Sequence, residues 1–312
     1  MLRKALAMVG LMGVLLTSIS CRDHSDRSTS ASELASTVNA TERIVLGDIS
    51  DDPLEKIDRY QPLADYLATH LAEFGIGEGA VTIAPDIETM AQMMQSGAVD
   101  IYFDSLYPAA IVSQQSGAEP ILRRWKKGRA EYHTIFFARA DSGITSLEDL
   151  QGKLIGVEES ESTSGYFLPI VYLLKAELNP VEKQRETDTV AMDEVGYVFT
   201  GEDENTIQWV GSRKVAAGVI DSHSFSRIPE ESRADLVILA ETETIARQVA
   251  VIAADIDPQL RAALQQLLLE LDESSEGKKI LTTFEETTQF DLLPPESGWD
   301  RIKELYQVFQ SR

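Results

Sequence analysis

The stretch Ser160-Glu161-Ser162-Thr163-Ser164-Gly165-Tyr166-Phe167-Leu168-Pro169 lies between two apolar segments of different kinds. The segment before it, 153–157, is a short apolar run, which is typical of a buried strand. The segment after it, 170–178, has the length and composition of a helix. We therefore predict a turn from a strand into a helix, which is the repeating unit of an α/β fold.

This turn collects groups that can donate hydrogen bonds to an anion. The first N–H groups of a helix have no acceptor inside the helix, and the helix dipole places partial positive charge there. The hydroxyls of Ser162, Thr163 and Ser164 add donors, and Pro169 fits a first turn because its missing N–H would have no partner there. The alternative is an ordinary helix cap, since Ser and Thr are common at that position for structural reasons alone.

Short strands and longer helices alternate along most of the chain. Strands are predicted at 44–47, 81–84, 99–103, 132–139, 196–199, 215–220, 236–240 and 248–252, and helices at 56–74, 87–95, 259–271 and 299–309. The glycine-rich run 75–79 is predicted to be a turn. The alternation predicts mainly parallel sheets with helices on both faces, which bind ligands beyond the carboxyl ends of their strands.

The N-terminal residues have the layout of a secretory signal peptide. Two basic residues in 1–4 precede an apolar run at 5–16 that is too short to span a bilayer, and residues 1–20 are predicted to be removed. Cys21 is the only cysteine, so the chain has no internal disulfide, and its position resembles the lipid-modified cysteine of bacterial lipoproteins. Ser18 stands where those signals usually carry Leu, so the alternative is a signal cut elsewhere. Residues 21–41 are predicted to be a flexible tether after the lipidated Cys21.

The chain is strongly acidic. It has 28 basic and 51 acidic residues and a net charge of −23, which becomes −25 without Arg3 and Lys4 of the signal segment. Such a body repels nucleic acid, and it repels an anionic ligand at long range as well. An anion site must therefore depend on local donors. The one basic cluster, 123–127, is predicted to be a solvated face or edge, or else a contact for a partner or an anion.

Several blocks of sequence, in order along the chain, resemble the phosphonate- and phosphite-binding components of ABC importers, which are two-lobed periplasmic solute-binding proteins. The blocks are PLADYL at 62–67, VDI at 99–101, YHT at 132–134 leading to DSGI at 141–144, SLEDLQGK at 146–153, and STSG at 162–165 with Pro169. The resemblance implies a type II periplasmic-binding-protein fold, in which crossover strands form a hinge and the ligand is enclosed between the lobes. Lobe 1 would be 42–133 with 247–312, and lobe 2 would be 134–246.

The resemblance also implies which residues contact the ligand. Ser162, Thr163 and Ser164, with Gly165, would bind the oxygen atoms of a phosphonate, and Tyr132 would line the cleft. The other walls would be Asp104, Ser105, Tyr107, Asp203, Asp221 and Arg247. Asp203 stands where many members have His, and Arg247 lies in a segment that replaces the family's Pro-rich crossover. Arg247 could donate two hydrogen bonds to an oxyanion, or it could pair with Glu241, Glu243 or Asp255.

The function that the resemblance implies is capture of a small phosphorus oxyanion (phosphonate, phosphite or phosphate-like) and its delivery to an ABC permease in the inner membrane. The protein would be a monomeric, periplasmic or cell-surface lipoprotein without cofactor, metal or nucleic-acid partner. The four histidines, His24, His70, His133 and His223, have no metal-ligand spacing. One alternative is a receptor module for a membrane sensor kinase. Another is a hydrolase using Ser162 or Ser164, although no G-x-S-x-G elbow is present.

Overall fold

The computed structural model describes residues 42–311. The predicted signal segment 1–20, Cys21 and the tether up to residue 41 lie outside the described residues, and their assignments stay predictions. Within the described part, none of the helices combines the length and the apolar composition needed to cross a membrane.

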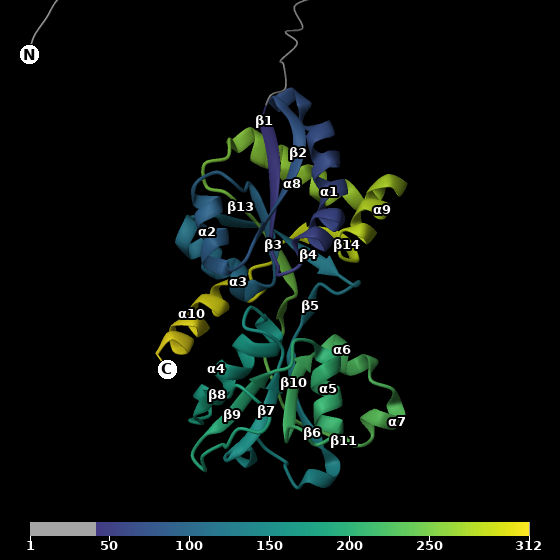
Figure 1. Ribbon diagram of the computed structural model, residues 1–312. Helices are drawn as coiled ribbons and strands as arrows, with labels where there is room; N and C mark the ends of the chain where they lie inside the picture. The colour runs from purple at the N-terminus through teal and green to yellow at the C-terminus, as the bar shows by residue number, and fades with distance from the viewer. Residues whose placement is uncertain (1–41, 312) are drawn as a thin grey trace, which may run out of the picture. The chain divides into compact units, whose positions relative to one another are not determined.

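The first of two large sheets uses strands from both ends of the described chain (Figure 1). Its strand order is β14 (Thr287–Leu292), β4 (Glu119–Lys126), β13 (Gln248–Ile252), β3 (Ile101–Asp104), β1 (Glu42–Ile49) and β2 (Ile76–Ala84). The pairs of β1 with β2 and β3 are parallel, and the other three pairs are antiparallel.

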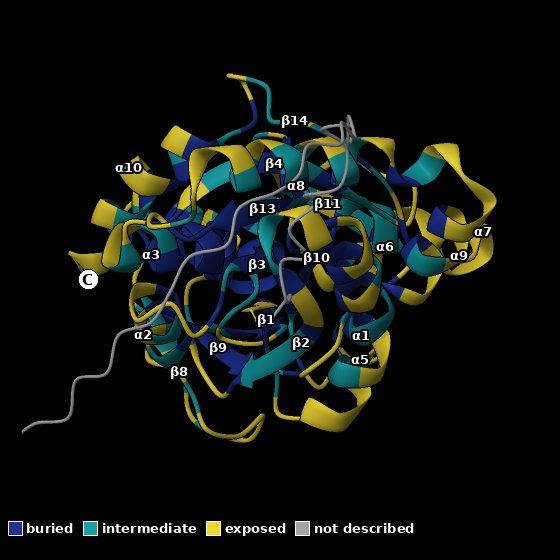
Figure 2. Cartoon of the chain, turned by 90° about the horizontal axis from the view of Figure 1, so that it is seen from above, coloured by how far each residue is buried: buried dark blue, intermediate teal, exposed yellow. Residues whose placement is uncertain are grey.

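Helices cover both faces of this sheet because successive side chains of a strand point to opposite sides. Ile101 and Phe103 belong to the core formed with α1 (Pro53–His70), α8 (Pro258–Glu270) and α9 (Ser275–Thr283). Tyr102, between them, belongs to the core formed with α2 (Ile87–Gln95) and α3 (Leu106–Ser116). Buried residues accordingly line the strands and the inner helix faces, and exposed residues lie on the outer faces (Figure 2).

The second large sheet is formed by strands within residues 134–241, which lie in the sequence between the segments that form the first sheet. Its strand order is β11 (Leu236–Glu241), β6 (Thr134–Arg139), β10 (Ala217–Asp221), β7 (Lys153–Val157), β9 (Val195–Phe199) and β8 (Pro180–Glu182). Strands β10, β7, β9 and β8 are parallel, and β6 and β11 are antiparallel to their neighbours. Helix α4 (Leu168–Lys175) packs on one face, and α5 (Asp203–Gly211) and α6 (Ser222–Arg227) pack on the other; α7 (Glu230–Arg233) follows α6.

Two short strands join these sheets. The chain leaves the first sheet through β5 (Glu131–Tyr132) and returns through β12 (Ile245–Ala246), and the two pair antiparallel. The strands that follow directly, β6 and β13, run antiparallel to the strands of the sheets that they enter, so each sheet has a parallel and an antiparallel half. This arrangement confirms the predicted α/β fold class with crossover strands.

The C-terminal helix α10 (Trp299–Gln310) packs on helices that belong to both sheets, α3 and α4. At this junction the rings of Tyr107 and Phe167 stack with centroids 4.2 Å apart. Phe309 of α10 lies 5.9 Å from the Tyr107 ring and 5.4 Å from the Phe167 ring. The helix is fixed at its start, because the Ala246 amide donates to the carbonyl of Ser297 over 2.7 Å.

Two sequence predictions about local structure are wrong. Most of the run 75–79 belongs to β2. Gly79 is needed there for close packing, since a Cβ atom at Gly79 would lie 2.2 Å from the Ala64 backbone of α1. The sequence predicts that the strand at 99–103 opens into a loop at 104–107, but Asp104 ends β3, Ser105 is the N-cap of α3 and Leu106 begins that helix. The apolar residues of α3 are buried on nearly every side and therefore give no periodic signal.

Candidate functional site

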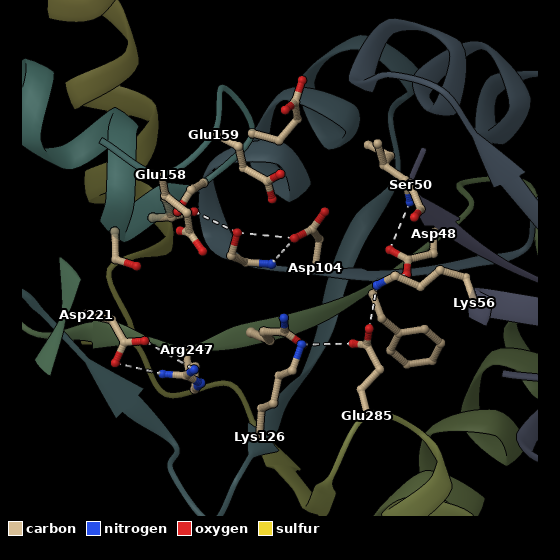
Figure 3. Close-up of a pocket in the computed structure, with 18 of the residues that line it drawn as sticks. Asp48, Ser50, Lys56, Asp104, Lys126, Glu158, Glu159, Asp221, Arg247 and Glu285 are labelled. Atoms are coloured by element: carbon tan, nitrogen blue, oxygen red, sulfur yellow. Dashed lines mark hydrogen bonds and ion pairs between the residues drawn. The ribbon is translucent and has the colours of Figure 1, made fainter. Parts of the chain in front are cut away.

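A cavity of about 500 Å³ lies where the loops of the two sheets meet (Figure 3). Its polar walls come mostly from the carboxyl ends of parallel strands, as expected for α/β sheets. Asp48 is the last residue but one of β1, Asp104 ends β3, Glu158 follows β7 and Asp221 ends β10. The other polar lining residues that the argument uses are Lys56, Ser105, Lys126, Tyr132, Ser162, Thr163, Ser164, Arg247 and Glu285.

The Ser162–Gly165 turn combines the two roles that the sequence leaves open. Ser162 is a helix cap, since its Oγ accepts a hydrogen bond from the Gly165 amide over 2.9 Å. Thr163 and Ser164 line the cavity at the start of the helix, where the first amides lack intrahelical acceptors. The turn is therefore both a cap and a wall of the cavity.

The helix after this cap starts with one π-type turn, Thr163–Phe167, before it becomes α4. Pro169 lies in the first turn of α4, as the sequence predicts, and the π-type turn precedes it. Because Pro169 has no N–H, the carbonyl of Gly165 lacks its usual donor four residues on. The Glu158 amide donates to that carbonyl over 3.0 Å, and this bond fixes the end of β7 against the turn.

The Thr163 hydroxyl connects the two sides of the cavity. Its Oγ1 accepts a hydrogen bond from the Tyr107 amide over 2.9 Å and donates to Ser105 Oγ over 2.8 Å. Both partners lie at the start of α3, which follows the first sheet. The side chain predicted to bind ligand is therefore already engaged in a contact between the two halves.

Arg247 supplies a positive charge to the cavity. Its Nη1 lies 3.4 Å from Oδ1 of Asp221, its Nη2 lies 3.5 Å from Oδ2, and its guanidinium lies 5.0 Å from the centre of the Tyr132 ring. The prediction that it pairs with Glu241, Glu243 or Asp255 is wrong. Its buried Nε and Nη1 atoms make no hydrogen bond with a described residue. Arg247 therefore keeps donors for a ligand.

Asp221 holds Arg247 in place through a well-organised carboxylate. Its Oδ1 accepts hydrogen bonds from the His223 and Ser224 amides at the start of α6. Burial alone would raise the pKa of this carboxyl, but Arg247 and those amides lower it below its ordinary value. Asp221 is consequently ionised at neutral pH and forms a pair with Arg247.

A second charged network lines the side of the cavity formed by the first sheet. Lys56 pairs with Asp48 over 2.7 Å and with Glu285, and Lys126 pairs with Glu285 over 3.0 Å (Figure 3). The Arg124 side chain is fully buried and lies 3.1 Å from Glu285. The prediction of a solvated face at 123–127 is thus wrong for residues 123–126, because β4 carries them into the sheet, while Lys127 follows the strand and is exposed.

A family model for the periplasmic substrate-binding protein of phosphonate ABC transporters matches residues 49–295 of the chain. The chain belongs to this family. The match includes both crossovers and every strand of the two large sheets except β1, of which it reaches only Ile49, and it ends before α10.

Solved structures of relatives agree with this family and fold. XAC2383 from Xanthomonas citri, bound to chloride or to ATP, is 30% or 29% identical, with a TM-score of 0.78 over 86% of this chain and 97% of that one. A binding protein component of an ABC phosphonate transporter from Pseudomonas aeruginosa is 20% identical, with a TM-score of 0.60 over 86% of each chain. PhnD1 from Prochlorococcus marinus, in complex with methylphosphonate, is 16% identical, with a TM-score of 0.62 over 86% of this chain and 98% of that one.

In this member of the family, five carboxyl groups at or beside the cavity have raised pKa values, namely Asp48, Asp104, Glu158, Glu159 and Asp203, and the rise is large for three of them. Burial, with a smaller contribution from Asp203, raises the pKa of Glu158 to about 8. Burial, with a smaller contribution from Asp221, raises the pKa of Asp203 to about 7. Burial, with a smaller contribution from Asp48, raises the pKa of Asp104 to about 7. A large share of these three groups is therefore neutral at physiological pH, so the cavity is less negative than its composition suggests.

The structure brings most of the predicted site residues to one cavity, while their contact with a ligand stays a prediction. Asp104, Ser105, Tyr132, Ser162, Thr163, Ser164, Asp221 and Arg247 line it. The other three lie behind that surface. Gly165 packs against Glu158, and Tyr107 stacks on Phe167. The negative charge of Asp203 raises the pKa of Glu158.

The sequence prediction missed nine charged residues that line the cavity: Asp48, Asp51, Lys56, Lys126, Glu158, Glu159, Glu161, Glu202 and Glu285. Asp48 and Glu158 each stand at or after the end of a predicted strand, so the rule that ligands bind at strand ends would have found them. Three others come from unrelated elements: Lys56 from helix α1, Lys126 from the unpredicted strand β4, and Glu285 from a turn. No local pattern in the sequence places these three together.

Proposed function

We propose that this protein captures a small phosphorus oxyanion between two lobes and delivers it to an ABC permease. The observation that carries this proposal is the Arg247 guanidinium, whose buried Nε and Nη1 atoms have no hydrogen-bond acceptor among residues 42–311, in the same cavity as the Ser162–Gly165 helix start. A guanidinium and helix amides are the donors that proteins use most for phosphorus oxyanions. Tyr132 connects them, since it interacts with Arg247, Ser164 and Thr163.

Capture is proposed to proceed by closure of lobe 1 (42–133 with 247–312) on lobe 2 (134–246). The bond from Thr163 to Ser105 joins the two lobes, so it stabilises their closed arrangement. A ligand that bridges Arg247 and the helix start adds contacts that the open state lacks. No bond of the ligand needs to break, and the Ser162 oxygen serves as a helix cap that accepts a hydrogen bond from the Gly165 amide.

Calorimetry on the purified protein tests the proposal. The ligands are phosphate, phosphite, methylphosphonate and 2-aminoethylphosphonate, and at least one is expected to bind more tightly than about 1 mM, or about 4 kcal/mol. Arg247→Gln removes a hydrogen bond to a charged group worth about 1.5–3 kcal/mol, so affinity should fall about 10- to 100-fold.

The matched control is Arg213→Gln, which removes an exposed arginine that pairs with Asp141 away from the cavity. It is expected to leave affinity unchanged. Equal losses in both variants, or no binding of any of the four oxyanions by the unaltered protein, would contradict the proposed ligand class.

ATP belongs in the same panel as a second candidate ligand. It is bound by XAC2383, a relative at 29% identity, and a cavity of about 500 Å³ has room for more than a one-phosphorus anion. A nucleotide bound more tightly than every phosphonate would favour a sensing role, such as a receptor module for a membrane kinase, over nutrient uptake.

We also propose that the mature protein is a periplasmic or cell-surface lipoprotein. Cys21 after a signal-like segment supports the lipid anchor, and residues 22–41 would form the tether. The mass of the N-terminal peptide from the protein made in a bacterial host checks this proposal. An unmodified Cys21 or a start at another residue would exclude the anchor.

A further inference from the structure

We propose that Glu158 binds the ligand as a neutral carboxylic acid and donates its own hydrogen to an oxygen atom of the oxyanion. This inference rests on the proposed function, since it assumes that an oxyanion occupies the cavity. It makes Glu158 a binding residue that limits capture to conditions under which the acid keeps its proton.

The first argument is the position of the side chain. The Glu158 amide is bonded to the Gly165 carbonyl, and a Cβ atom at Gly165 would lie 2.5 Å from Oε2 of Glu158. The carboxyl group therefore lies directly on the helix start where the amides are expected to hold the anion. Glycine at 165 is what leaves room for it. Glu158 also lines the cavity (Figure 3). The Ser162 side chain lies close enough to lower its pKa by hydrogen bonding.

The second argument is the absence of a compensating cation among the described residues. Asp221 pairs with Arg247, and Glu285 pairs with Lys56, Lys126 and Arg124. Neither Glu158 nor Asp203 takes part in an ion pair between described residues, and the buried Oδ1 atom of Asp203 has no hydrogen-bond partner among them.

The groups that face Glu158 from each neighbouring element are mostly acidic. Asp203 comes from α5, Asp221 from β10 and Glu159 from the following loop, and each of them opposes ionisation of Glu158. The Ser162 hydroxyl favours ionisation, but its effect is smaller than that of burial. The charge of Arg247 lowers the pKa of Asp221 and of Asp203. Burial and these neighbours raise the pKa of Glu158 to about 8, which is consistent with a retained proton.

These acidic surroundings favour the neutral form of Glu158 when an oxyanion binds beside it. An ionised Glu158 next to an oxyanion would repel it with no cation between them. A neutral acid instead presents an O–H donor, and an O–H group that donates to a charged oxygen forms one of the stronger hydrogen bonds in proteins. The proton stays on Glu158, so the ligand needs to bring none.

Calorimetry of methylphosphonate and phosphate binding between pH 6.5 and 9.5 tests the proposal. For the unaltered protein, Kd should rise about tenfold per pH unit above about pH 8, because one proton must return to Glu158 on binding. Glu158→Gln keeps a donor of the same length without a titratable group. Its Kd should match that of the unaltered protein within about 3-fold at pH 6.5 and should lose this rise.

Proton uptake separates Glu158 from the ligand's own ionisation. Binding heats at pH 8.5 in two buffers of different ionisation enthalpy give the number of protons taken up, and the unaltered protein should take up more than Glu158→Gln does. Asp203→Asn should move the onset of weakening to lower pH, because Asp203 raises the pKa of Glu158. Glu230→Gln, on an exposed surface of the short helix α7, should keep the unaltered profile.

Two results would overturn the proposal. One is a pH profile of Glu158→Gln that is superimposable on that of the unaltered protein. The other is loss of binding by Glu158→Gln at pH 6.5 while its circular dichroism and melting temperature are unchanged, which would mean that the carboxylate charge is required. Failure of the unaltered protein to bind either oxyanion at pH 6.5 would instead contradict the proposed function.

Discussion

At the scale of single residues, Thr163 has a role in the structure besides the ligand contact that its sequence motif predicts. The Thr163 side chain is 1% exposed, and its hydroxyl bonds both the Tyr107 amide and Ser105. The sequence motif alone predicts a ligand donor, because a Ser-Thr-Ser run at a helix start is typical of anion sites. The partner residues come from a helix 56 or more positions away in the chain, and no local pattern could predict that pairing.

Thr163→Val tests this role, because it keeps the shape of the side chain and deletes the hydroxyl. The buried Tyr107 amide loses this acceptor, and such a loss costs about 1–3 kcal/mol. We expect a lower melting temperature of the ligand-free protein as well as weaker binding. Ser50→Ala, which removes a hydroxyl at the edge of the same cavity, is the control and should leave the melting temperature unchanged. Weaker binding with an unchanged melting temperature of Thr163→Val would mean that Thr163 acts through the ligand alone.

At the scale of elements, the strands with apolar runs could be predicted from the sequence, and those that carry charge could not. The helix Ile87–Gln95 and the strands Lys153–Val157 and Gln248–Ile252 match their predictions residue for residue. Strand β4 contains two arginines and a lysine, and only its place between β13 and β14 explains why Arg124 is buried beside Glu285. The candidate site divides in the same way, since its strand ends were predictable and its lysine network was not.

The C-terminal helix offers a test at this scale. Gly298 has φ +88°, and a Cβ atom there would lie 2.5 Å from Cγ2 of Ile245 in the crossover strand β12. Gly298→Ala should destabilise the protein by about 1–2 kcal/mol for the left-handed backbone and by about 1–3 kcal/mol more for overpacking. Gly128→Ala is the matched control, because Gly128 also has a positive φ (+71°) but open space around it. Urea unfolding should show the larger decrease in the free energy of unfolding for Gly298→Ala. Equal decreases in the two variants would mean that α10 moves away from Ile245 without loss of stability.

At the scale of the whole molecule, buried acids of opposite behaviour should set the pH of maximum stability. Asp221 and Glu285 have lowered pKa values, despite burial, because of Arg247 and helix amides in the first case and of lysines and Arg124 in the second. Their contribution is present above the unfolded pKa of about 4 and is lost as pH falls through their lower folded values. Asp104, Asp203 and Glu158 hold protons in the folded state up to about pH 7, 7 and 8, which the unfolded chain releases near pH 4. Stability should therefore fall as pH rises from about 4 to 8, and the growing negative charge of a chain with a pI of about 4.5 adds to this fall.

We expect the melting temperature of the ligand-free protein to be highest in mild acid and to drop by at least about 2–4 °C between pH 5 and pH 8.5. The triple variant Asp104→Asn, Glu158→Gln, Asp203→Asn should show a flatter profile above pH 5. A melting temperature of the unaltered protein that is constant or rises over that interval would mean that the three acids lose their protons readily in the folded state.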